Sequence, residues 1–138
     1  NDPYKEARSY EEVLNNELEV VNGIPQFDII MLGMGDDGHT ASIFPHEMNL
    51  WESSNLCVVA THPSSKQRRV SFSGKVINAA KNVVFLVTGA PKDKVVKAVI
   101  EDNENSQAKY PAARVNPISG NLIWFLDSYA GRELEENK

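Results

Sequence analysis

The sequence predicts an α/β fold with a mainly parallel sheet and flanking helices. Two short apolar runs, residues 27–32 and residues 82–88, have the length and composition of strands that are buried on both faces. Each run leads into a glycine-containing turn, and helical patterns alternate with strand candidates along the rest of the chain. The 138 residues suit one domain with a core of its own.

The first helix is predicted from a capping pattern and a helical repeat. Ser9 and Glu12 match a capping box, in which a hydroxyl and a carboxylate bind free amides of the first turn. Apolar residues at 13, 14, 18 and 21 follow at helical spacing, and residues 23–25 (Gly-Ile-Pro) end the pattern. The next strand, residues 27–32, is expected to be a central one.

The remaining elements follow in order. We expect strands over residues 55–61, 69–73, 82–88 and 122–126, a short helix over residues 75–80, and a surface loop over residues 102–109. Pro91 suits the first position of a helix that ends near Glu101. The tail from Arg132 is expected to be solvated.

Composition narrows the possible functions. The net charge of −5, without any basic stretch, argues against binding to nucleic acid. No apolar run is long enough to cross a membrane. The single cysteine, Cys57, excludes an internal disulfide and fits a reducing compartment such as the cytoplasm.

The most informative segment is residues 27–45, where an apolar strand runs into a glycine-rich turn. This turn brings Asp37 and His39 together on either side of Gly38, at the sheet edge where α/β proteins build their sites. We expect residues 40–42 (Thr-Ala-Ser) to open a short helix that Pro45 ends. A histidine can take a proton from water, and a carboxylate two residues away can orient the imidazole. Because no G-x-S-x-G elbow surrounds Ser42, water is the expected nucleophile.

Three other interpretations of this turn are weaker. The glycines satisfy G-x-G-x-x-G, but Asp36 and Asp37 would repel a pyrophosphate and Pro45 shortens the helix that a dinucleotide needs. The turn can also be purely structural, with Asp37 as a helix cap. The three histidines and Cys57 do not form a compact set of metal ligands.

The turn closely resembles the signature of the 6-phosphogluconolactonase family. The match runs over residues 33–45, Gly-Met-Gly-Asp-Asp-Gly-His-Thr-Ala-Ser-Ile-Phe-Pro, and further blocks follow in the family's order. These blocks are residues 68–72, 78–80, 87–92, 110–113 and 124–127. The resemblance implies a Rossmann-like fold and hydrolysis of 6-phosphoglucono-δ-lactone, a sugar-phosphate ester of the oxidative pentose phosphate pathway, without a metal or cofactor.

The resemblance also implies roles for single residues. His39 is expected to be the base and Asp37 its orienting partner, while Gly35 and Gly38 let backbone amides approach the substrate. Amides at the start of the expected helix would stabilise the oxyanion. Arg69 and Lys92 match the family's basic positions and are expected to hold the phosphate. Alternation along the strand points only one of Arg68 and Arg69 toward the site, and Arg69 is the first choice.

Family members are longer at the N-terminus, where they carry a phosphate loop. We therefore expect residues 1–138 to be the C-terminal portion of a larger α/β domain, weakly active alone, with an apolar face uncovered and prone to self-association. Two alternatives stay open. A glucosamine-6-phosphate deaminase shares the turn but usually continues it with Ile-Ala-Phe-Asn-Glu-Pro, and a non-catalytic sugar-phosphate-binding regulator would share the fold.

Overall fold

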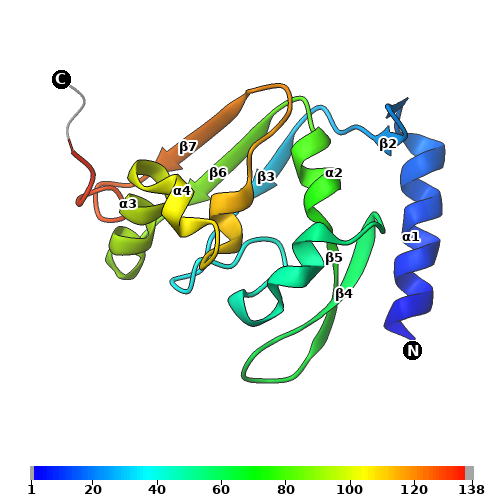
Figure 1. The fold of residues 1–138 in the computed structure, drawn as a ribbon, viewed down its shortest axis with the longest axis horizontal. Coiled ribbons are helices and arrows are strands. Elements are labelled where there is room, and N and C mark those ends of the chain that lie inside the picture. The colour runs from blue at the N-terminus through cyan, green and yellow to red at the C-terminus, as the bar shows by residue number, and fades with distance from the viewer. Residues whose placement is uncertain (1, 136–138) are drawn as a thin grey trace.

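The computed structural model describes residues 2–135 of the chain. Its centre is a parallel sheet of three strands in the order β3 (Ile30–Leu32), β6 (Val83–Val87) and β7 (Leu122–Leu126), which lie side by side in Figure 1. The register aligns Leu32 with Phe85, and Phe85 with Trp124. The predicted α/β class with a parallel sheet is confirmed.

Four further strands form two antiparallel ribbons outside this sheet. The larger ribbon pairs β4 (Cys57–Thr61) with β5 (Arg68–Phe72), and the smaller one pairs β1 (Val20–Val21) with β2 (Ile24–Pro25). The strands predicted over residues 55–61 and 69–73 are therefore present. They pair with each other and do not join the parallel sheet. The ribbon β4–β5 packs against the first helix, to the right of the sheet in Figure 1.

Short helices make the connections. They are η1 (Pro45–Glu52), α2 (Gly74–Ala79), η2 (Ala90–Lys92), α3 (Asp93–Glu101), α4 (Asn103–Ser106) and η3 (Pro111–Arg114). The helices predicted after residue 75 and after Pro91 are confirmed. The prediction of a surface loop over residues 102–109 is wrong in part, because α4 lies within this segment. The Ser106 hydroxyl donates to the carbonyl of Ala98, which ties α4 to α3.

The first helix, α1 (Pro3–Glu17), starts earlier than predicted. Its N-cap is Asp2, whose carboxylate accepts hydrogen bonds from the amides of Tyr4 and Lys5, and Pro3 follows as the first helical residue. The predicted capping box at Ser9 is therefore wrong. An Asp-Pro pair satisfies the free amides of the first turn and presets its φ, so Ser9 lies in the middle of the helix.

The end of α1 also differs from the prediction. The helix stops at Glu17, and Val20 and Val21 form a strand that turns back at Asn22 and Gly23. Both turn residues have positive φ, 53° and 81°. Such a two-residue turn favours Asn-Gly, which is a hairpin signal inside what reads as a helical repeat.

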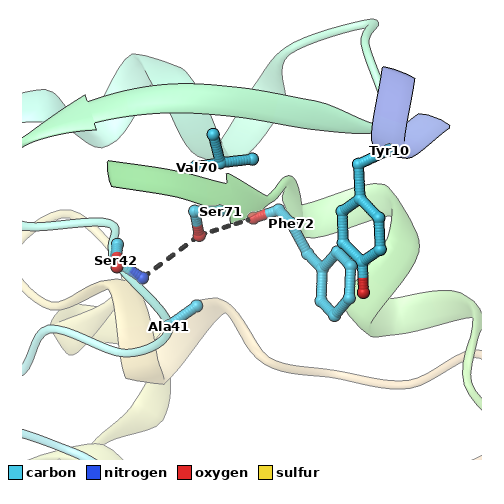
Figure 2. Close-up of a pocket in the computed structure, with 6 residues that line it drawn as sticks. All are labelled: Tyr10, Ala41, Ser42, Val70, Ser71 and Phe72. Carbon is cyan, nitrogen blue, oxygen red and sulfur yellow. Dashed lines mark hydrogen bonds between the residues drawn. The ribbon is translucent and has the colours of Figure 1, made fainter. Parts of the chain in front are cut away.

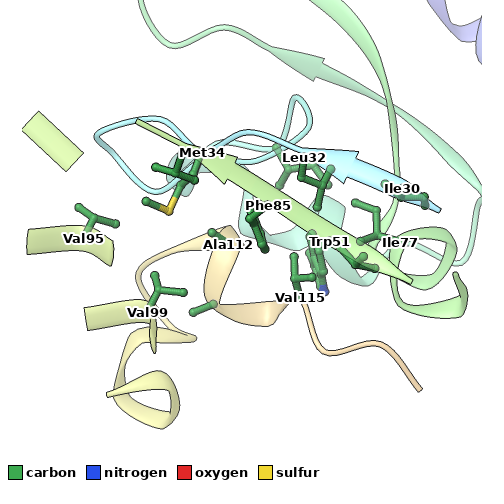
Figure 3. Close-up of a cluster of buried hydrophobic side chains, with 14 of the residues drawn as sticks. Ile30, Leu32, Met34, Trp51, Ile77, Phe85, Val95, Val99, Ala112 and Val115 are labelled. Carbon is green, nitrogen blue, oxygen red and sulfur yellow. The ribbon is translucent and has the colours of Figure 1, made fainter. Parts of the chain in front are cut away.

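The main core lies on one face of the parallel sheet (Figure 3). Inward-facing residues of β3 and β6, such as Leu32 and Phe85, pack against Ile77 of α2 and Val96 of α3. Phe85 also stacks on Trp124 of β7, with ring centroids 4.0 Å apart. A second, smaller cluster joins Ala7 and Leu14 of α1 to Cys57 at the start of β4.

The opposite face of the sheet is apolar and exposed. Met31, Leu86 and Phe125, one from each strand, are 68%, 56% and 56% exposed. In the described part of the chain β3 is an edge strand with one exposed face, so the central, doubly covered strand predicted over residues 27–32 is not seen there. Within residues 2–135, the core-forming helices pack on the other face of the sheet. The expected uncovered apolar face is present, and self-association through it stays a prediction.

Candidate active site

The turn that follows β3 is held by hydrogen bonds at both ends. The amide of Gly35 donates to the carbonyl of His39 (3.0 Å), and the amide of Gly38 donates to the carbonyl of Gly35 (3.0 Å). The buried hydroxyl of Thr40 donates to the carbonyl of Gly33 (2.8 Å). These contacts fold residues 33–40 into a closed loop at the carboxyl end of the strand.

The short helix predicted over residues 40–42 is not formed. Instead Thr40 and Ile43 close a tight turn, in which the Ile43 amide donates to the Thr40 carbonyl and Ala41 has a φ of 52°. Pro45 begins the helix η1 rather than ending one, which is the position that proline favours. No helix therefore begins at these residues, so the expected source of amides for an oxyanion is absent. The backbone amides of the same residues belong to the tight turn instead.

Asp37 and His39 form a direct pair. The Nδ1 atom of His39 lies 2.6 Å from Oδ1 of Asp37, and the same oxygen accepts the His39 backbone amide at 3.0 Å. An ionised carboxylate only accepts hydrogen bonds, so Nδ1 carries the proton and Nε2 of the neutral ring is free to accept one. Both side chains stay partly accessible, at 30% for His39 and 40% for Asp37. The predicted proximity of these two residues is present.

The carboxyl group of Asp37 is held in its ionised form. Burial raises the pKa of Asp37, but hydrogen bonds from the His39 amide and imidazole, together with the attraction of the imidazole in its protonated form, outweigh burial and lower the pKa below its usual value. Asp37 is therefore a carboxylate at neutral pH, as an orienting partner for an imidazole requires.

Gly35 and Gly38 are required for reasons of space. A β-carbon at Gly35 would collide with the imidazole ring of His39, and one at Gly38 would collide with the Tyr110 ring. Gly38 also has a φ of 83°, and its carbonyl accepts the amide of Ala112 (3.0 Å). The two glycines thus let the loop close around His39 and dock on η3.

A cavity of about 320 Å³ opens beside this loop. Its lining includes Gly33, Gly35, His39 and Ala41 from the loop, and Lys92 from the turn after β6. The structure thus brings three predicted site residues, Gly35, His39 and Lys92, to one cavity. Gly38 and Asp37 belong to the same loop but do not line the cavity.

The turn that carries Lys92 is held by Asp127, the residue that follows β7. The carboxylate of Asp127 accepts the Gly89 amide at 3.1 Å and the Ala130 amide at 2.8 Å. Hydrogen bonds from the Ala130 and Gly89 amides lower the pKa of Asp127, although burial opposes them. Sequence reasoning missed this role, although an aspartate at a strand end is a signal for an amide-binding turn.

Arg68 and Arg69 point to different faces of the ribbon, as alternation predicts. The Arg68 guanidinium carbon lies 5.7 Å from the centre of the Tyr4 ring on α1. Arg69 shares its strand face with Ser71, whose hydroxyl accepts the amide of Ser42 in the turn after His39. Figure 2 shows this contact at a smaller cavity of about 180 Å³ that also touches Tyr10. Arg69 itself lies outside both cavities, and its Nε donates to the Gln67 side chain.

Phe44 is a further residue that sequence reasoning missed. Its ring is buried and stacks on the His39 imidazole, with the centroids 4.3 Å apart. An apolar residue near a turn is usually interpreted as a core residue, and no local sequence pattern marks its contact with His39. In residues 2–135 no group of three or more His, Cys, Asp or Glu side chains is arranged to hold a metal ion, and no helix has the length and apolar character needed to cross a membrane.

Residues 1–124 match the sequence profile described as glucosamine-6-phosphate isomerases/6-phosphogluconolactonase. The chain belongs to this family. A 6-phosphogluconolactonase of Treponema pallidum is 49% identical over 100 residues, which are 72% of this chain and 42% of that protein. One of Haemophilus influenzae is 42% identical over 134 residues, which are 97% of this chain and 55% of that protein.

Solved structures of the family agree with the fold. The 6-phosphogluconolactonase of Trypanosoma brucei is 31% identical and superposes with a TM-score of 0.82, covering 96% of this chain and 54% of its own. The chain thus spans about half the length of the relatives it matches. That residues 1–138 are the C-terminal portion of such a domain stays a prediction.

Proposed function

We propose that this protein hydrolyses 6-phosphoglucono-δ-lactone to 6-phosphogluconate, with a water molecule activated by His39. The observation that carries the proposal is the Asp37–His39 pair, 2.6 Å apart, at the edge of a cavity that Lys92 also lines. The names of the relatives support the substrate, because proteins 42–49% identical to this chain are 6-phosphogluconolactonases.

In this mechanism His39 acts through Nε2. Asp37 holds the proton on Nδ1, so Nε2 takes a proton from water as the oxygen attacks the lactone carbonyl. Asp37 then stabilises the imidazolium without itself becoming protonated, because its pKa is lowered. The proton passes to the ring oxygen as the ester bond breaks, which leaves a carboxylic acid and a free hydroxyl. General-base assistance of this kind contributes about 10²–10⁴ in rate.

The substrate phosphate needs a cationic partner. Lys92 is the first candidate, because it lines the cavity with His39 and its turn is anchored by Asp127. Arg69 is the second, because its strand face is the one that contacts the Ser42 turn. The cavity volume of about 320 Å³ is within the range of pockets for small ligands. A cytoplasmic location fits the free Cys57 and stays a prediction.

The test is a lactonase assay on the purified product of the complete reading frame that encodes this chain. We expect 6-phosphogluconate to form faster than by spontaneous hydrolysis, and the His39→Gln variant to lose most of this acceleration. Ammonia release from glucosamine 6-phosphate is measured in parallel, because it would indicate a deaminase instead. Hydrolysis at the spontaneous rate would contradict the proposal.

A further inference from the structure

The His39 imidazole is held by more than its hydrogen bond to Asp37. A single hydrogen bond at Nδ1 fixes one edge of the ring but leaves the ring free to tilt about that bond. The plane of the ring is set by Phe44, which is 2% exposed and stacks on it at 4.3 Å with an angle of 27° between the rings. The imidazole ring also lies against Gly35, so it has no room to move toward the Gly35 backbone.

Phe44 is itself held in place by its other neighbours. The ring of His62, at the end of the β4–β5 ribbon, meets Phe44 edge-on, with centroids 5.2 Å apart and an angle of 71°. His62 is fixed in turn, because its Nδ1 accepts the amides of Ser64 and Ser65. Pro45 follows Phe44 as the first residue of η1, so the backbone at Phe44 is restricted as well.

We propose that Phe44 is a positioning residue for His39, which keeps Nδ1 on Asp37 and leaves Nε2 available for water. The proposal rests on the proposed role of His39 as the base. A catalytic group must lie close to its reacting geometry, and a displacement of about 1 Å costs on the order of 100-fold in rate. The stack acts on the orientation of the ring, whereas binding of the sugar phosphate depends on other residues. Loss of the stack is therefore expected to lower kcat and to leave KM nearly unchanged.

The test uses Phe44→Leu in the product of the complete reading frame, with Phe44→Met as a second variant if the first does not fold. Both keep an apolar side chain of similar volume and remove the ring. Phe44→Tyr keeps the ring and is expected to retain activity. The matched control is Phe85→Leu, because Phe85 is also fully buried and stacked, on Trp124, but contacts the core.

Two quantities are measured for each variant: kcat and KM for the lactone, and the populations of the two neutral tautomers of His39 by ¹⁵N NMR. We expect nearly pure Nδ1–H tautomer in the unchanged protein and in Phe85→Leu. In Phe44→Leu we expect a mixture of tautomers and a kcat lower by about ten- to hundredfold. The tautomer measurement requires no turnover, so it tests Phe44 even if His39 proves not to be the base. An unchanged tautomer population in the ring-less variants, or an equal loss of kcat in Phe85→Leu, would overturn the proposal.

Discussion

The loop that carries His39 and the ribbon that carries Arg69 are held in very different ways. His39 contacts Asp37, Phe44 and the backbone of Gly35, and the loop around it is closed by its own hydrogen bonds. Arg69 donates to one exposed partner, Gln67, two residues away. His39 is thus held in place before any substrate arrives, whereas Arg69 would have to be oriented by the ligand proposed for it. This difference predicts that the two regions affect different kinetic constants.

The largest effect is expected at His39. Replacing it with Gln should lower kcat for the lactone by about two or more orders of magnitude, because the general base is lost. KM should change little, since the imidazole is not expected to bind the phosphate. The matched control is His46→Ala, because His46 also lies near Phe44 but pairs with Glu47. Near-normal kcat in His39→Gln would remove His39 as the base.

The next effect is expected at Arg69. Arg69→Ala should raise KM for the phosphorylated lactone by about tenfold, through loss of a charge-assisted contact. Glucono-δ-lactone, which has no phosphate, should be hydrolysed as before. Arg68→Ala is the matched control, because Arg68 lies against Tyr4 on the other face. A KM that rises for Arg68→Ala instead would show that the opposite face of the ribbon meets the substrate.

A smaller effect is expected at Asp127, which anchors the Lys92 turn. Asp127→Ala should raise KM for the phosphorylated lactone a few-fold, because the Gly89 amide loses its acceptor. The pH dependence has a definite sign. Because folding lowers the pKa of Asp127 from about 3.8, its stabilising effect is present above that value and is lost as pH falls through the lower, folded pKa.

Thermal melting of the Asp127→Ala variant between pH 7 and pH 2 checks this dependence. The difference in Tm from the unchanged protein should be largest at neutral pH and should shrink in acid. The matched control is Asp28→Ala, which removes an exposed carboxylate paired with Lys81 and should change little. A difference that persists unchanged at pH 2 would contradict the role of the ionised carboxylate.

The smallest effect is expected at Cys57, at the root of the ribbon. Burial raises the pKa of the Cys57 thiol to about 11, with a further contribution from Glu11. Cys57→Ala should leave lactone hydrolysis unchanged, and in the folded protein the thiol should react with a disulfide reagent only slowly at pH 8. Fast reaction without denaturant would show that the ribbon opens where β4 begins, and would contradict the buried state of the thiol.

The contrast between the two regions also explains what the sequence could predict. Asp37 and His39 are two residues apart, so their pairing follows from the glycine turn alone. Lys92 was predictable because it follows a strong strand signal, and neighbouring parallel strands end at one edge. The orientation of Arg69 depends on how an antiparallel ribbon docks on the rest of the chain, which no local pattern encodes.

The errors in the predicted fold arose where two local sequence signals compete for the same segment. Ser9 and Glu12 match a capping box, but Asp2 and Pro3 form the actual start of the helix. Val21 continues a helical repeat by chance, while Asn22 and Gly23 specify a hairpin. Phe44 could not be recognised, because a stacking contact with a histidine leaves no mark on hydrophobic periodicity.

The proposed mechanism requires Asp37 and His39 to act as one unit in lactone hydrolysis. A double-mutant cycle tests it directly, with kcat/KM measured for Asp37→Asn, for His39→Gln and for both changes together. Residues that act as a unit are strongly non-additive, since the orienting group has nothing to orient once the base is gone. We predict that the double variant is as active as His39→Gln alone. Losses that multiply in the double variant would show that Asp37 acts independently of His39, and would contradict its proposed role as the orienting partner.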